Sequence, residues 1–160
     1  KIIDGTKISE GDVLIGLKSS GPHSNGYTLI RKLFDGDKEI GKKLVEPTRI
    51  YVKEVMALIK QVDVNGIAHI TGGGLDNISR INDNFQYGID NPLPVPSIFD
   101  WLQEKGSVED KEMYRTFNMG MGMLIIVSKD DAEKSVSILG EHAQIVGSVN
   151  SGTGVKHSAL

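Results

Sequence analysis

The 160-residue chain lacks cysteine altogether. That absence excludes disulfide bonds, thiolate metal sites and cysteine nucleophiles, and it fits the reducing cytoplasm, where we expect the protein to act. Long apolar runs are also missing. The longest, Met121–Val127, is far shorter than the roughly 20 residues that cross a bilayer. We therefore expect no membrane-spanning segment and interpret this run as a buried strand.

An excess of positive charge is absent as well. The net charge is −3, whereas a protein that binds nucleic acid without regard to sequence is normally basic, so we expect no nucleic-acid partner. Lysine and arginine are spread along the chain, so any site for an anion must be local. Hydrophobic residues make up 39% of the chain and charged residues 24%, which is typical of one folded globular domain.

Several motifs of known chemistry do not occur. No group of histidines and carboxylates has the spacing of metal ligands, so we expect no metal site in this chain. Neither a Gly-x-Ser-x-Gly nucleophile elbow nor a dinucleotide-binding fingerprint is present. The chain begins with Lys1 instead of methionine and has no signal-peptide pattern, which indicates a fragment or a processed product.

The apolar periodicity alternates between strand-like and helix-like segments. This predicts an α/β (α+β) fold, a mixed β-sheet with packed helices, over residues 1–160. Strands are expected at 12–17, 67–70, 114–127 and 143–149, the third of them bulged or broken at its glycines. Helices are expected after Gly26, at about 48–61, around 75–81, from 97 to Gly106, and from Asp130.

Polar residues near the expected helix starts predict how these helices are capped. Thr48 is expected to cap the second helix, and Ser97 with Asp100 resembles a capping box. Phe34 in the first helix and Ile50 in the second are expected to face the core.

The first segment with chemical potential is 19–26, Ser-Ser-Gly-Pro-His-Ser-Asn-Gly, between a strand and an amphipathic helix. Exposed N–H groups and the positive end of a helix dipole suit such a junction to phosphate. The candidate ligands are Ser20, Gly21, Ser24 and Asn25, and His23 is able to donate a hydrogen bond or to exchange a proton. A purely structural turn, with Ser24 or Asn25 capping the helix, fits the same residues.

The second segment, 69–74, ends a strand and opens a helix with His-Ile-Thr-Gly-Gly-Gly. Three consecutive glycines cost backbone entropy that an ordinary turn does not require. Gly72, Gly73 and Gly74 therefore indicate close approach to a ligand or an anion-binding nest. Thr71 adds a hydroxyl group. His69 fits a ligand contact and a structural histidine equally well.

The third segment, 113–122, contains Arg115, whose planar guanidinium suits a phosphate or a carboxylate. A surface ion pair on a strand explains the same residue without a ligand. Gly120 and Gly122 predict a bulge or a close backbone contact. Arg49, in a weaker fourth segment, is interpreted as solvated. From the residues alone, the chain is predicted to be an anion-binding α/β domain.

Five tracts that follow one another along the chain resemble a single enzyme family. Their order and residues are similar to those in the second domain of the phosphoribosylformylglycinamidine cyclo-ligases, also called AIR synthetases. Together the tracts extend over nearly the whole chain. They are 11–17 with 19–27, 46–53, 69–74, 99–102 and 112–118.

This resemblance implies an ATP-dependent reaction of purine biosynthesis that needs Mg²⁺. In that family, ATP activates the formyl amide oxygen of formylglycinamidine ribonucleotide, and an internal nitrogen closes the imidazole ring of aminoimidazole ribonucleotide. The family's enzymes are cytoplasmic homodimers with two domains in each chain. An amino-terminal domain that binds most of the ATP and Mg²⁺ is then absent from this chain, so the isolated domain is expected to lack turnover.

Carried onto this chain, the resemblance places the 20–25 loop and the 71–74 run at a cleft between the two domains, where they hold substrate or nucleotide phosphate. It makes His23 and His69 the candidate catalytic residues, with His23 orienting the formyl group or stabilising transferred phosphoryl charge. Arg115 is either a phosphate ligand or structural. The tail, 157–160, departs from the family pattern, and no function is assigned to it.

Two kinds of alternative stay open. Related enzymes of the same superfamily share the two-domain plan: formylglycinamidine ribonucleotide amidotransferase, selenophosphate synthetase and thiamine-monophosphate kinase. The 69–74 and 113–118 tracts favour the cyclo-ligase among them. The other alternative is a phosphate-binding or assembly domain without catalysis.

Overall fold

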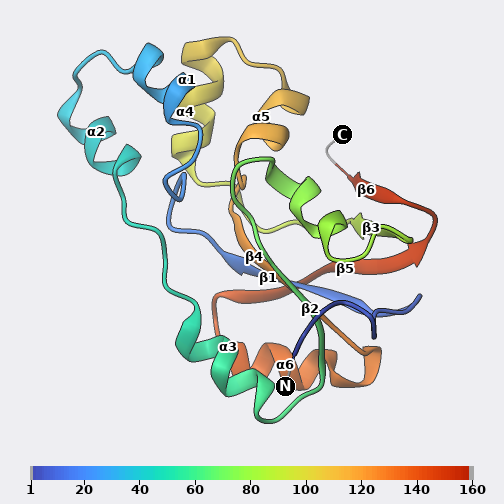
Figure 1. Ribbon diagram of the computed structural model, residues 1–160. Helices are drawn as coiled ribbons and strands as arrows, with labels where there is room; N and C mark the ends of the chain where they lie inside the picture. Colours follow the sequence, from blue (N-terminus) through green and yellow to red (C-terminus); the bar gives the residue numbers. More distant parts are fainter. Residues whose placement is uncertain (1, 159–160) are drawn as a thin grey trace.

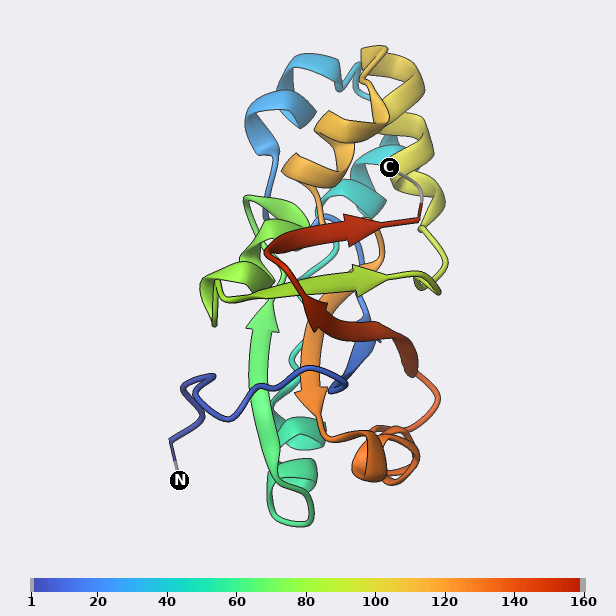
Figure 2. The same cartoon turned by 90° about the vertical axis from the view of Figure 1, so that its right-hand side faces the viewer.

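A six-stranded curved sheet forms the centre of the protein, for which the computed structural model describes residues 2–158 (Figure 1). The strands lie in the order β2-β4-β1-β5-β3-β6, and their pairs are antiparallel except for β3 with β6. β5 curves so that β3 and β6 cross the direction of β2 and β4 (Figure 2). The bounds are β1 Val13–Lys18, β2 Val64–His69, β3 Phe85–Ile89, β4 Met121–Val127, β5 Ala143–Ser151 and β6 Gly154–His157.

Two groups of helices flank this sheet (Figure 1). One group is α3 (Val52–Ile59) and α6 (Ala132–Leu139), which pack against each other. The other is α1 (Tyr27–Leu33), α2 (Lys38–Leu44), α4 (Ser97–Gly106) and α5 (Asp110–Thr116). The short 3₁₀ helices η1 (Gly74–Arg80) and η2 (Lys129–Asp131) follow β2 and β4. The predicted mixed sheet with packed helices is confirmed.

The central strands are buried on both faces, which explains their continuous apolar sequences. In β1, Leu14 belongs to a core cluster shared with η1 and β3, whereas Ile15 and Leu17 belong to the cluster beneath α3 and α6. A one-residue slip would exchange the two faces, so this alternation fixes the register. A third cluster, around Phe99 and Phe117, joins the other helix group.

The expected strand over 114–127 is wrong in its first half. Residues 110–116 form α5, and β4 begins only at Met121. The side chain of Asn118 reverses the chain between them: its Nδ2 donates to the Gly21 carbonyl at 2.8 Å, and its Oδ1 accepts from the Gly120 N–H at 2.9 Å. Met119 and Gly120 both have positive φ in this turn. Gly120 therefore lies at the boundary between α5 and β4.

The expected helix caps are also wrong. Gly26, Tyr51 and Pro96 occupy the N-cap positions of α1, α3 and α4, and none of them supplies a side-chain cap. Thr48 lies outside α3 because the preceding chain is tied to β1 by a hydrogen bond from the Tyr51 hydroxyl to the Lys18 carbonyl. As a result, Ile50 does not face the core.

Two apolar side chains that were expected in the core are instead exposed. Ile50 is 78% exposed because it precedes α3, and Phe34, which follows the last turn of α1, is 41% exposed. The last helix, expected from Asp130, begins at Ala132 after the 3₁₀ turn that Ser128 caps.

The sequence did not predict α2, β3 or β6. Asp37 caps α2 by accepting hydrogen bonds from the N–H groups of Glu39 and Ile40. The tail is part of the sheet, because His157 pairs with Ile89 in β6. Ala159 and Leu160, the rest of that tail, lie outside the described residues.

We expect Gly26→Ala to destabilise the fold by roughly 1–3 kcal/mol more than Gly36→Ala. Both glycines have positive φ, so both variants carry the cost of left-handed backbone. Only at Gly26 would an added Cβ overlap a neighbour, the Phe117 ring; at Gly36 the space is open. Urea unfolding of the two variants measures the difference. Equal losses of unfolding free energy in the two variants would show that Phe117 moves aside without cost.

Candidate active site

Three rings from separate segments form a cluster at the carboxyl end of β2. The centroids of His23 and His69 are 5.9 Å apart, and each lies 6.0 Å from the Tyr51 ring. His23 comes from the loop after β1, Tyr51 from the N-cap of α3, and His69 from the last position of β2. The structure thus brings both predicted histidines together. It adds Tyr51, which the sequence analysis did not single out.

His23 and Tyr51 are the buried members of this cluster, with 2% and 4% of their surfaces exposed, whereas His69 is exposed. The Nε2 of His23 accepts a hydrogen bond from the Ser20 N–H at 3.0 Å, so the neutral ring carries its proton on Nδ1. Nδ1 is buried without an acceptor among residues 2–158. Burial, together with the nearby His69 and Arg49, lowers the pKa of His23 to about 4. At neutral pH it is therefore an uncharged hydrogen-bond donor.

Backbone strain accompanies this burial. His23 and Ser24 have φ of 51° and 58°, a left-handed conformation that is uncommon for residues other than glycine. Such strain persists only where the surroundings hold the chain in place. The loop is held by Asn118, which donates to the Gly21 carbonyl, and by Ser20, whose hydroxyl donates to the Pro47 carbonyl at 2.7 Å.

Gly122 of β4 has no side chain, and the Tyr51 and His23 side chains occupy the space that one would fill. A Cβ at this position would overlap the Tyr51 hydroxyl and the Cε1 of His23. A bulge or a close contact was expected at Gly122, and the structure has both, since the pairing of β1 with β4 shifts register at this residue. The Tyr51 hydroxyl donates to the Lys18 carbonyl at 3.0 Å, and burial raises the pKa of this phenol, so it stays protonated.

Arg49 packs on the same cluster and is not simply solvated. Its guanidinium pairs with Glu54 at 2.6 Å, and both side chains are about four-fifths buried, with 20% and 19% exposed. It also lies 5.3 Å from the centre of the Tyr51 ring, a cation–π geometry. The Pro-Thr-Arg-Ile-Tyr tract at 47–51 was the sequence signal for these contacts.

Asn25 joins the two predicted loops. Its Oδ1 accepts from the Gly72 N–H at 2.9 Å, and its Nδ2 donates to the His23 carbonyl at 2.7 Å. The loop after β1 and the glycine run after β2 are therefore one hydrogen-bonded unit. Ser24 is exposed on this unit, with its hydroxyl 3.5 Å from that of Thr48.

The glycine run is shaped largely by contacts within the protein. Asn77 accepts from the N–H and hydroxyl of Thr71 and donates to the Gly72 carbonyl. Gly73 has φ of 103° and lies against Asn77, while a Cβ on Gly74 would overlap the Tyr114 carbonyl oxygen.

These contacts leave few N–H groups of the run for an anion. The N–H groups of Thr71, Gly72 and Gly74 already donate within the chain, and only that of Gly73 meets no acceptor in the described part of it. The assignment of this run to phosphate stays a prediction, with Gly73 as its available donor.

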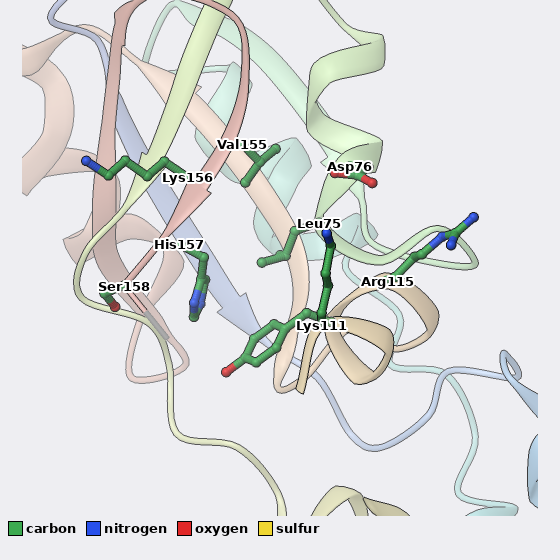
Figure 3. Close-up of a pocket in the computed structure, with 9 residues that line it drawn as sticks. Leu75, Asp76, Lys111, Arg115, Val155, Lys156, His157 and Ser158 are labelled. Carbon is green, nitrogen blue, oxygen red and sulfur yellow. The ribbon is translucent and has the colours of Figure 1, made fainter. Parts of the chain in front are cut away.

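Arg115 does not belong to the cluster of His23, Tyr51 and His69. It is on α5 and not on a strand, its side chain is 74% exposed, and Glu112 lies 3.9 Å away. It lines a pocket of about 680 Å³ that also includes Lys111 and His157, and Figure 3 shows its guanidinium at the outer edge. None of the residues that line this pocket lines the smaller groove of about 300 Å³ beside His69.

No three His, Asp or Glu side chains within residues 2–158 are grouped in a way that would hold a metal ion. No helix in that range has the length and apolar character needed to cross a bilayer.

Comparison with known proteins identifies the family. Residues 9–159 match the family model "AIR synthase related protein, C-terminal domain". The chain therefore belongs to the AIR synthase related family. This family domain is 44% identical, over 96% of the chain, to the phosphoribosylformylglycinamidine cyclo-ligase of Methanopyrus kandleri. The match covers 48% of that relative, so the chain spans about half its length.

Solved structures share the fold of the family domain at low sequence identity. The hydrogenase maturation protein HypE of E. coli superimposes with a TM-score of 0.72 at 20% identity, over 98% of this chain and 49% of HypE. Thiamine monophosphate kinase from Aquifex aeolicus gives a TM-score of 0.62 at 17% identity, over 98% of this chain and 52% of the kinase. At such identities the likeness shows the fold alone.

We expect His23 to remain neutral until the pH falls to about 4. Because this pKa lies below the unfolded value of 6.5, the contribution of neutral His23 to stability is present above pH 6.5 and is lost as the pH falls toward 4. NMR titration of the ring protons measures the midpoint. His69→Gln should raise it by removing a repulsive charge, and His142→Gln serves as the control. A midpoint near 6.5 in the parent chain would contradict this prediction.

We expect Asn25→Ala to speed hydrogen exchange of the Gly72 amide about fivefold to tenfold. The variant removes the acceptor of that N–H, and one hydrogen bond contributes about 1 kcal/mol. The control is Ser24→Ala, whose exposed hydroxyl makes no contact with Gly72 in the described structure, and it should leave this amide unchanged. Unaltered exchange in Asn25→Ala would show that the two loops are held together by other contacts.

Proposed function

We propose that this chain is the carboxy-terminal half of an ATP-dependent cyclo-ligase that closes formylglycinamidine ribonucleotide to aminoimidazole ribonucleotide. The observation that carries this proposal is the 44% identity to a cyclo-ligase across 96% of the chain. The cluster of His23, Tyr51 and His69 supports it, because it combines a fixed neutral donor with an accessible imidazole.

The proposed reaction closes a ring at an unreactive amide carbon. The formyl oxygen takes the terminal phosphoryl group of ATP, which leaves ADP and turns that oxygen into part of a leaving group. An internal nitrogen then attacks the same carbon, the carbon–oxygen bond breaks, and phosphate departs. The attacking nitrogen loses a proton, so the site needs a base near the ring that forms.

His69 is proposed as that base. Its ring is exposed at the end of β2 and borders the groove of about 300 Å³, so a substrate is able to reach it. His23 lies beneath it, neutral and held through Nε2 by the Ser20 N–H. His23 is proposed to donate its Nδ1–H to oxygen charge that develops on the formyl group, without changing its own protonation; because Nδ1 is buried in this structure, the proposal requires that substrate binding uncover it.

The phosphate groups are proposed to lie along the unit that Asn25 joins. The exposed Ser24 hydroxyl and the Gly73 N–H are its available donors. Ser20, Gly21, Thr71 and Gly72 form hydrogen bonds that keep the loops in shape. Gly74 permits the close approach of η1 to α5. Arg115, on the rim of a different pocket, is retained only as a peripheral phosphate ligand.

ATP and Mg²⁺ are proposed to be bound mainly by an amino-terminal half that this chain does not include. The part of the chain from 2 to 158 offers no metal-binding cluster, so no step is assigned to a metal within it. One HypE structure with this fold was solved in complex with ATP, which supports nucleotide binding by the two-domain plan. The full-length protein is proposed to be a cytoplasmic homodimer, and the isolated half to lack turnover.

The related superfamily enzymes are weaker candidates. Structures of one of them, thiamine-monophosphate kinase, match at 15–18% identity, well below the 44% of the cyclo-ligase. A domain without catalysis does not explain why two histidines and a strained loop meet at the end of β2, with one of the histidines open to a groove.

Ring closure in a reconstituted chain tests the proposal. In the fusion chain, the amino-terminal half of the Methanopyrus kandleri relative precedes residue 1. We expect it to form aminoimidazole ribonucleotide from formylglycinamidine ribonucleotide and ATP. His69→Asn should lower kcat about 100-fold, as expected for loss of a general base.

The matched control is His142→Asn, which changes a half-exposed histidine that lines neither pocket and should alter kcat less than about twofold. A folded fusion chain that yields no aminoimidazole product would refute the cyclo-ligase assignment. Equal kcat values for the two histidine variants would remove His69 from the mechanism.

A further inference from the structure

The cavity of about 680 Å³ that Arg115 borders lies between α5, η1 and β6, apart from the groove beside His69. Both α5 and β6 pack against η1, so the three elements form its walls. We call this cavity the η1 pocket. Pockets that hold small molecules usually measure about 300–1,000 Å³. The η1 pocket therefore has the size of a small-molecule site, and the candidate active site does not use it.

Positive charge is concentrated at the η1 pocket. Lys111, Arg115 and Lys156 line it, whereas Asp76 is the one carboxylate among the described lining residues. In Figure 3 the side chains of Arg115 and Lys156 lie at opposite edges of the pocket, with that of Lys111 between them. The chain as a whole has a net charge of −3, so this excess of cations is local. It favours an anionic ligand.

These cations are available to a ligand. Neither Lys111 nor Lys156 forms an ion pair within residues 2–158. Arg115 has Glu112 at 3.9 Å, but both side chains are largely exposed, and such surface pairs contribute little to stability. An anion is therefore able to bind the three cations without first breaking a strong interaction.

The floor of the η1 pocket is apolar and aromatic. Leu75 is buried there, and Val155 and Tyr114 are partly buried against the same core cluster. The Tyr114 ring lies 4.5 Å from that of His157, whose pKa is lowered by burial, so His157 is uncharged at neutral pH. A bare phosphate would leave this floor exposed to water. An anion that carries a flat ring would cover it.

We propose that the η1 pocket is a second ligand site, for an organic phosphate with an aromatic ring such as a nucleoside monophosphate. Lys111 and Arg115 bind the phosphate, for which the planar guanidinium is well suited. The ring of the ligand lies against Tyr114 and Val155 on the floor. The enclosing walls favour a small molecule over a segment of another protein. Binding at this pocket does not require the cyclo-ligase reaction.

The η1 pocket is also in contact with the glycine run. Leu75 and Asp76 directly follow Gly74 in η1, and a Cβ on Gly74 would overlap the Tyr114 carbonyl oxygen. A ligand between α5 and η1 therefore restrains the residues that end the run. This gives the ligand the role of an effector that holds the run in place. The effector role, unlike binding itself, rests on the proposed function.

Calorimetric titration of the 160-residue chain with AMP tests the site. We expect one AMP to bind, and Lys111→Gln to weaken binding at least about tenfold through loss of a contact to a charged group. The control is Lys42→Gln on α2, which changes another exposed lysine outside the pocket and should alter the affinity less than about twofold. Because Lys111 is exposed, its variant should keep the melting temperature of the parent.

Two parts of AMP test the two halves of the pocket separately. Ribose 5-phosphate lacks the base and should bind at least about fivefold more weakly than AMP, because the apolar floor stays uncovered. Adenosine lacks the phosphate and should bind at least about tenfold more weakly. The proposal is overturned if AMP binds Lys111→Gln as tightly as the parent, or if either part binds as tightly as AMP.

The place of binding is measured by amide NMR shifts. AMP should shift the amides of α5 and β6 most. Shifts confined to the loop at 20–25, together with weaker binding by Ser24→Ala than by Lys111→Gln, would assign AMP to the candidate active site and overturn the proposal. The fusion chain should retain the Lys111-dependent binding. Its loss there would show that the amino-terminal half fills the pocket, which also overturns the proposal.

Hydrogen exchange tests the effector role. The Gly74 N–H donates to the Thr71 carbonyl at 2.9 Å, and AMP should slow its exchange in the parent chain but not in Lys111→Gln. Unchanged exchange in a chain that binds AMP would refute the effector role.

Binding by the isolated chain does not depend on turnover, so the site and the proposed function fail separately. Lys111-dependent binding of AMP, with a fusion chain that forms no aminoimidazole product, argues against the cyclo-ligase alone. An active fusion chain without Lys111-dependent binding argues against the η1 pocket alone.

Discussion

A side chain cannot be accommodated at Gly122, because the Tyr51 hydroxyl and the His23 ring fill the space above β4. This steric constraint determines the arrangement of the candidate site. It lets the loop after β1 fold down onto the sheet, where His23 is buried and loses its charge. It also lets Tyr51 reach the Lys18 carbonyl, which ties the chain before α3 to β1. His69, on the neighbouring strand, then lies above both rings.

Asparagine amides hold the loops around this site. Asn25 links the first loop to the glycine run, Asn77 closes the turn at Thr71, and Asn118 joins the first loop to the segment before β4. Each amide both donates and accepts within the chain, which an aspartate or a leucine of similar size does not do. Loops satisfied in this way are preorganised, so ligand binding needs little further ordering.

The parts of the fold that follow from local pattern were predictable. The apolar residues of β1 and β4 indicated buried strands, and the periodicity of α3 and α6 indicated helices. The boundary at Asn118 was not predictable, because it depends on a hydrogen bond to the distant Gly21. β3 and β6 are short and have weak alternation, and their pairing is determined only by the rest of the sheet.

The candidate site was likewise predictable where it depends on local sequence and not where it depends on distant contacts. Glycine and histidine patterns located His23, His69 and the run at 71–74, and the structure places these segments together. Tyr51 and Arg49 were missed as members of the cluster, because their roles depend on contacts with Lys18, Glu54 and Gly122 from other segments. Sequence also gave no reason to expect that most N–H groups of the glycine run are already used.

The position of β1 in the sheet has a consequence for biosynthesis. Val13 pairs with Val127 on one side and with Ser148 on the other, so the first strand of this domain has neighbours that are translated much later. Both edges of this apolar strand stay unpaired while most of the domain is translated. Closure of such distant contacts is slow compared with helix formation. The nascent chain is therefore exposed to aggregation until β5 emerges, and a chaperone that shields β1 would act at that stage.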